Sequence, residues 1–161
     1  MKYPNLRDVQ KEMKKMKKLT WWFRIVGAFY MLLAIMNMYA LFVNPGVLKS
    51  SIPFPLDDLG LKVALDMWSP FAFDLLGIGT FLLWASRNTQ KYIGVVWFTV
   101  WLEFLHGVLD DLFLISRGYD AAGYIGFTVV HLIIIATGIV FVRQVEAQSS
   151  QPAPLVTKGN A

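Results

Sequence analysis

The chain has 161 residues, of which 56% are hydrophobic and 16% are charged, so apolar residues exceed their share in an ordinary soluble domain. It contains no cysteine, which excludes disulfide bonds and thiolate chemistry and leaves two histidines and eleven carboxylates as metal-binding side chains. The net charge of +4 is concentrated near the start of the chain, which argues against a nucleic-acid-binding protein. The composition therefore indicates an integral membrane protein.

Residues 1–20 are predicted to form a basic amphipathic segment on the cytoplasmic side. Apolar residues recur there at helical spacing, and lysines occupy the other faces. Such a helix would lie on the anionic inner leaflet of the bilayer and bind it through its lysines. The alternative is that the lysines only orient the protein in the membrane.

Four apolar runs are long enough to cross a bilayer core, which needs about 20 helical residues. They cover residues 21–43, 63–85, 92–115 and 119–142. We therefore predict an all-α fold, in which residues 21–142 form a bundle of four transmembrane helices. The connection 44–62 either folds over the outer mouth of this bundle or spans two splayed helix ends. Residues 143–161 contain Pro, Ser and Gln without periodicity and are predicted to be a disordered cytoplasmic tail.

The basic residues predict the orientation of the four helices. If both termini are cytoplasmic, that side carries twelve of the fifteen lysines and arginines, and the opposite side carries only Lys49, Lys62 and Arg117. This asymmetry follows the positive-inside rule. Tryptophan and tyrosine residues at the ends of the apolar runs agree with the same topology.

Three of the predicted helices carry an ionisable residue near their middle. Asp74, Glu103 and His131 occupy this position in the second, third and fourth helices. A charge that faces lipid at this depth costs roughly 2.5–3.5 kcal/mol. We therefore expect the three side chains to face one another inside the bundle.

The third helix extends this polar cluster toward the outer side. In an α-helix, one face would carry Thr99, Glu103, His106 and Asp110. Asp111 is rotated by about 100° from Asp110, and we expect it to have only an interfacial role.

A proline in the second helix suggests how the cluster becomes accessible. Pro70 removes the backbone hydrogen bond to the carbonyl of Asp66, and a kink there would open the outer half of the bundle. The expected result is a polar intramembrane cavity that is open toward the outside. Its further lining residues would be Asp66, Asn37, Tyr124 and Thr128.

Three hypotheses for this cluster remain open. The first is a cavity that binds or handles a small molecule or protons, and the second is a structural or accessory subunit in which the cluster only joins helices. The third is an intramembrane enzyme, either an acid–base isomerase or a metal-dependent one. Glu103 and His106 have the Glu-x-x-His spacing of di-iron bundles, which use two such motifs where this chain has one. His131, Asp74 and Asp110 could complete a single mononuclear site. No cofactor follows from these residues.

Three stretches of the sequence resemble the BphX-like family of small bacterial four-helix membrane proteins: WWFRIVGAFYMLL, LLWASR and HGVLDDLFLISRGYDAAGYIGFTVVHLIIIATGIVFVR. The resemblance covers roughly residues 20–143. It implies a multi-pass protein of the bacterial cytoplasmic membrane. Family members are associated with gene clusters for the degradation of biphenyl and related aromatic compounds.

That association implies a small ligand that is apolar or aromatic, and it assigns no catalytic residue. The walls of a suitable cavity would include Phe71, Phe73, Trp101 and Phe127. The ligand, any reaction and the oligomeric state, including a homo-oligomer, stay open.

Overall fold

The computed structural model describes residues 6–149, and this part of the chain is helical with no β-strand. The elements are α1 (Leu6–Phe42), α2 (Pro45–Ser51), α3 (Asp58–Ala85), η1 (Ser86–Asn88), α4 (Ile93–Leu102), η2 (Glu103–Leu109), α5 (Asp110–Ser116) and α6 (Ala121–Ser149). The short η1 is a 3₁₀ turn, and η2 is a π-helical segment that joins α4 and α5 into one continuous rod. The all-α prediction is confirmed.

Four helical stretches in the described part are long and apolar enough to cross a membrane. They are Met13–Phe42, Asp58–Asn88, Ile93–Ser116 and Ala121–Ala147. Each contains most of one predicted apolar run, so hydrophobic length alone located the four long helices.

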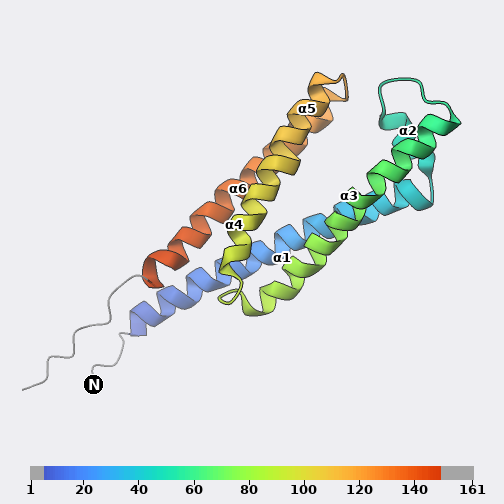
Figure 1. Cartoon of the computed structure of the whole chain (residues 1–161). Helices are drawn as coiled ribbons and strands as arrows, with labels where there is room; N and C mark the ends of the chain where they lie inside the picture. The colour runs from blue at the N-terminus through green and yellow to red at the C-terminus, as the bar shows by residue number, and fades with distance from the viewer. Residues whose placement is uncertain (1–5, 150–161) are drawn as a thin grey trace, which may run out of the picture.

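The four long helices form two antiparallel pairs (Figure 1). One pair is α1 with α3, and the other is the α4–η2–α5 rod with α6. The pairs meet where α1 packs on α6, and they diverge toward the end that carries α2 and the α5–α6 turn. The molecule is therefore a V of two helix pairs, and its open end is the region that the predicted cavity would occupy.

Two glycines set the crossing of α1 and α3. A Cβ atom on Gly79 would lie 2.9 Å from the backbone nitrogen of Met31 and 3.1 Å from the carbonyl oxygen of Gly27. Small residues at such a crossing let two helix backbones touch, which maximises van der Waals contact in an apolar environment. The buried face of α3, which includes Ala72 and Leu82, is consequently directed at α1.

Pro70 does not interrupt α3, which continues from Asp58 to Ala85. The Asp66 carbonyl that loses its backbone partner at Pro70 accepts a hydrogen bond from the Ser69 hydroxyl, at 2.9 Å. The open end of the molecule arises from the divergence of the two helix pairs.

The N-terminal basic segment continues the first long helix. Because α1 runs unbroken from Leu6 to Phe42, a separate helix on the membrane surface is not formed in the described part of the chain. No glycine or proline lies between Leu6 and Arg24 to end a helix, and Leu19 is fully buried. Residues 1–5 lie outside the described residues.

The predicted disordered tail is helical over its first seven residues, because α6 extends to Ser149. Packing explains this difference. Val145 is buried, and the Trp97 indole N–H donates to Glu146 at 3.1 Å. On the α1 side, Lys15 donates to the carbonyl of Gln144 at 3.4 Å. Residues 150–161 lie outside the described residues.

Gly79→Ala is expected to lower the thermal unfolding midpoint of the purified protein in detergent. The added methyl group would meet the α1 backbone, and overpacking of this kind costs about 1–3 kcal/mol. Circular dichroism measures the midpoint. Gly77→Ala is the matched control, because no atom lies within 4 Å of its Cβ position. Equal midpoints for the two variants would contradict the proposed crossing.

Candidate functional site

Two of the three predicted midplane residues meet inside the molecule. Glu103 in η2 is 1% exposed, and its Oε2 atom lies 2.5 Å from Nδ1 of His131 in α6. This short hydrogen bond joins a carboxylate to an imidazole in the interior of the molecule, where an unpaired charge would be costly. Tyr30 of α1 is also buried, and its hydroxyl is close enough to Glu103 for the two groups to interact electrostatically.

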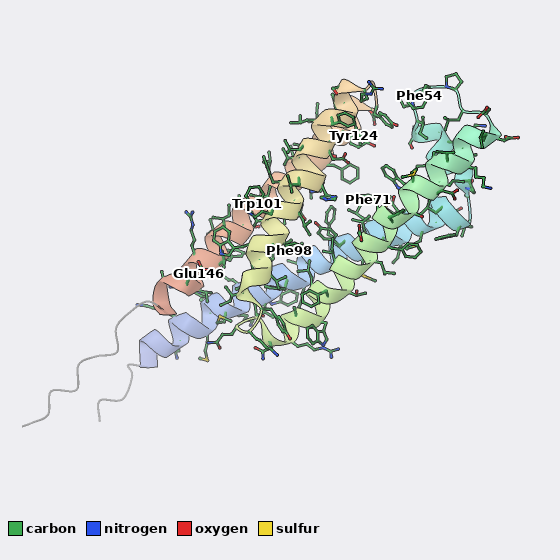
Figure 2. All side chains as sticks on the ribbon, viewed as in Figure 1. Phe54, Phe71, Phe98, Trp101, Tyr124 and Glu146 are labelled. Atoms are coloured by element: carbon green, nitrogen blue, oxygen red, sulfur yellow. The ribbon has the colours of Figure 1, made fainter. Side chains whose placement is uncertain are left out.

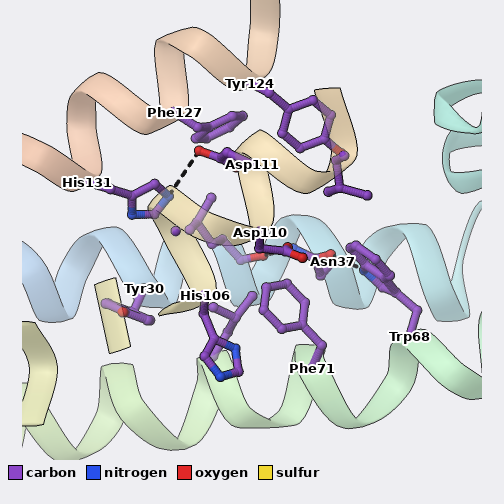
Figure 3. A pocket seen from close by; sticks show the side chains of 14 residues that line it. Tyr30, Asn37, Trp68, Phe71, His106, Asp110, Asp111, Tyr124, Phe127 and His131 are labelled. Atoms are coloured by element: carbon purple, nitrogen blue, oxygen red, sulfur yellow. Dashed lines mark hydrogen bonds and ion pairs between the residues drawn. The ribbon is translucent and has the colours of Figure 1, made fainter. Parts of the chain in front are cut away.

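A second carboxylate lies on the other side of the imidazole. Oδ2 of Asp111 is 3.9 Å from Nε2 of His131, and Figure 3 shows this contact as a dashed line. Asp111 is 5% exposed and accepts a hydrogen bond from the Thr128 hydroxyl at 3.0 Å. The His131 ring therefore lies between two buried acidic side chains from the same rod.

The π-helical segment explains why Asp111, and not Asp110, faces His131. In an α-helix, Asp111 would be rotated by about 80° from Glu103. The π-helical turns of η2 contain more residues per turn than an α-helix does. Residues four apart therefore lie on one face, and Glu103, Gly107 and Asp111 are buried together. A Cβ atom on Gly107 would overlap the His131 ring, so the absence of a side chain there lets the ring reach both carboxylates.

His106 and Asp110 are consequently turned away from Glu103, contrary to the predicted polar face. His106 is exposed and directed toward α3, where its ring lies parallel to that of Phe71 with the centroids 6.5 Å apart (Figure 3). The interfacial role predicted for Asp111 is wrong, because Asp111 is buried against α6. The error came from applying α-helical geometry through η2.

The two aspartates of α3 do not join this cluster. Asp74 is exposed and lines a neighbouring cavity of about 270 Å³, which shares Tyr30, Phe71, Leu75 and His106 with the cavity beside His131. Asp66 is exposed and lines neither that cavity nor the one at His131. The buried face of α3 is directed at α1 and does not include Asp74, and the backbone of α3 does not approach η2, which carries Glu103.

Side chains from both helix pairs enclose a cavity of about 200 Å³ beside His131. Its lining residues are Tyr30, Leu33, Asn37, Trp68, Phe71, Leu75, His106, Gly107, Asp110, Asp111, Leu114, Tyr124, Phe127 and His131. Figure 2 shows Phe71 and Tyr124 reaching from opposite pairs into the space between them. The ionisable lining groups are carboxylates, histidines and tyrosines, with no lysine or arginine.

The aromatic wall differs in part from the expected one. Phe71 and Phe127 line the cavity, whereas Phe73 and Trp101 are more than half exposed and lie on other faces of their helices. Trp68 is an unpredicted wall residue, and its indole N–H donates to Asn37 at 2.7 Å.

The connection between α1 and α3 reaches across the open end of the V. Phe54, which follows α2, packs edge-to-face on Tyr119 in the α5–α6 turn, with ring centroids 6.5 Å apart. The loop thus spans the splayed ends and also contacts the second helix pair at the mouth.

The metal candidates do not converge. Within the described residues, no group of three His, Cys, Asp or Glu side chains is arranged to hold a metal ion. Glu103 and His106 belong to η2, where the Glu-x-x-His spacing no longer places both side chains on one face. His106 is turned away from the pair that Glu103 forms with His131.

The chain is similar to a known protein family. A family model described as BphX-like matches residues 16–147. The chain belongs to the BphX-like family. The match spans all four long helices, so the family resemblance in the sequence is confirmed. No curated protein matches this BphX-like chain, and no solved structure matches it.

The site of this BphX-like protein has a buried end and an accessible end. Glu103 holds one nitrogen of the His131 ring, while the other nitrogen faces Asp111 at the cavity. A histidine oriented in this way can exchange a hydrogen bond or a proton at its free nitrogen. Asp111 adds acceptor oxygens at the same end. The polar end of the cavity therefore suits a molecule that carries a hydrogen-bond donor.

Asp111→Asn is expected to shift the imidazole nitrogen NMR signals of His131, whereas Asp110→Asn should leave them nearly unchanged. Asp111 lies 3.9 Å from Nε2 of His131, and the two variants remove the same charge at adjacent positions. Histidine-labelled protein has only two imidazole groups, and His131→Asn assigns the signals. A larger shift in Asp110→Asn would show that the third helix is α-helical through this segment.

Proposed function

We propose that the protein is a multi-pass protein of the bacterial cytoplasmic membrane, with four spanning helices and both termini in the cytoplasm. Four long apolar helices and membership in the BphX-like family support the membrane location. The excess of lysine and arginine at one end supports the orientation.

The topology predicts which positions a reporter can reach. Alkaline phosphatase, which is active only outside the cytoplasm, should be active when inserted at Gly118 in the α5–α6 turn and inactive when fused after Ala161. Gly118 adopts φ 86° in this exposed turn, so an insertion there should disturb no helix. Enzyme assays on whole cells measure the difference. The reverse pattern would refute the orientation.

We further propose that the cavity beside His131 binds one small, mostly apolar ring compound. The observation that carries this proposal is the arrangement of aromatic walls from both helix pairs around one polar end. Trp68 and Phe71 come from α3, and Tyr124 and Phe127 come from α6. Cavities of this composition are typical of small-molecule sites, in which apolar walls give affinity and a few polar groups fix orientation.

The size of the cavity supports a compound with one or two rings. Its volume is about 200 Å³, and an apolar protein cavity of about 150 Å³ is large enough to bind benzene. This agrees with the aromatic ligand that the family resemblance implies.

The charges at the polar end support a ligand with a hydroxyl group over an anionic ligand. Asp110 and Asp111 line the cavity, and no lysine or arginine lies among its lining residues. Carboxylates repel a ligand carboxylate and accept hydrogen bonds from a hydroxyl group.

Leu114→Phe is expected to weaken binding of para-fluorophenol by about tenfold or more, because the larger side chain occupies part of the cavity. Fluorine NMR of the ligand in detergent measures the saturable binding. Leu112→Phe makes the same change two residues away in α5, where the side chain is 52% exposed and lines no part of the cavity. This control should bind as the wild type does.

Two results would count against the cavity proposal. One is a wild-type protein that gives no saturable signal beyond that of protein-free micelles. The other is an equal effect of the two phenylalanine substitutions. In either case the Glu103–His131–Asp111 cluster would be left with the structural role of joining η2 and α5 to α6.

A further inference from the structure

A further cavity lies between α1 and α6, at the end of the molecule where the two helix pairs meet. Its volume is about 560 Å³, and it shares no lining residue with the cavity beside His131. Its walls include Trp21 and Ile25 of α1, and Ile133 and Phe141 of α6. Trp21, Ile25 and Ile133 are each more than half exposed, so the cavity is a groove that opens sideways along the two helices.

Three lysines of α1 form the polar rim of this groove: Lys14, Lys17 and Lys18. All three are exposed, and none forms an ion pair with a side chain that the structure describes. No aspartate or glutamate lines the groove. The rim therefore presents positive charge directly beside an apolar surface.

The charged and apolar parts follow one another along one face of α1. Lys14, Lys18, Trp21 and Ile25 are spaced by four, three and four residues, which places them on the same side of the helix. This stretch rises about 16 Å along the axis. It passes from ammonium groups through an indole ring to an aliphatic side chain. A phospholipid has the same order, from phosphate through the interfacial region to the acyl chain.

We propose that this groove binds one anionic phospholipid molecule, with its phosphate beside Lys14 and Lys18 and an acyl chain against Ile25 and Ile133. Basic pockets between spanning helices bind anionic lipid headgroups. A free anion would use only the lysines, and a neutral lipid would use only the apolar wall. The inference rests on the proposed placement in a membrane and is independent of the ligand proposed for the His131 cavity.

Lipid retention tests this site directly. The purified protein in detergent is mixed with dioleoylphosphatidylglycerol or with dioleoylphosphatidylcholine, and bound lipids are counted by native mass spectrometry. We expect one tightly retained phosphatidylglycerol molecule, with an apparent affinity about tenfold above that of phosphatidylcholine, because interfacial lysines favour the anionic headgroup.

Paired variants separate the groove from general charge. Lys14→Gln combined with Lys18→Gln should abolish the preference for phosphatidylglycerol. Lys49→Gln combined with Lys62→Gln removes the same charge at the opposite end of the molecule and should keep the preference. Ile133→Trp fills the groove without changing its lysines, and it should reduce retention of phosphatidylglycerol.

Several outcomes would overturn the lipid site. These are equal retention of the two lipids by the wild type, equal losses in the two double lysine variants, or unchanged retention in Ile133→Trp. Full displacement of phosphatidylglycerol by inorganic phosphate would reduce the groove to a simple anion site. If the Lys14 and Lys18 variant fails to fold, Ile133→Trp decides. Failure here would leave para-fluorophenol binding unaffected, because the two cavities share no lining residue.

Discussion

The contact of the His131 imidazole with the α4–η2–α5 rod is the constraint on which the second helix pair depends. In an apolar environment, a carboxylate such as Glu103 must be paired, and here the pairing crosses from one helix to the next. The ring fits only because Gly107 has no side chain. It meets Asp111 only because η2 widens the helix. The same contact fixes the rotation of α6 against the rod.

The cavity between the two helix pairs arises because each pair makes its closest backbone contact within itself. The crossing of Gly27 and Gly79 holds α3 on α1, while Gly107 and His131 hold α6 on the rod. Among the described elements, the backbone of α3 approaches α1, α2 and η1 and does not approach the second pair. The space between the pairs is therefore bridged by long aromatic side chains such as Phe71. An aromatic-walled cavity is the geometric result of two pairs that pack internally and diverge.

The sequence predicted the features that depend on position along one helix, and it did not predict those that depend on how two helices pack. Apolar length located four long helices, and counting depth along them correctly paired Glu103 with His131. The rotation of α3 depends on the glycine crossing with α1, so Asp74 could not be placed from its own helix. Asp111 was missed because the helix was assumed to be regular. The sequence held one sign of the π-helical segment, which is the four-residue spacing of Thr99, Glu103, Gly107 and Asp111. Residues at this spacing rotate gradually off one face of an α-helix, whereas a helix with wider turns keeps them on one face.

The junction of the two helix pairs lies at the proposed lipid groove. The Trp22 indole N–H of α1 lies 3.1 Å from the Thr137 hydroxyl oxygen and 3.3 Å from the Ile134 carbonyl oxygen of α6. Ile134 and Thr137 line the groove and lie one to two turns from His131 on the same helix. A lipid in the groove would add contacts to α1 and α6 at the vertex of the V. Such contacts would stabilise the junction of the two pairs without involving any residue that lines the cavity beside His131.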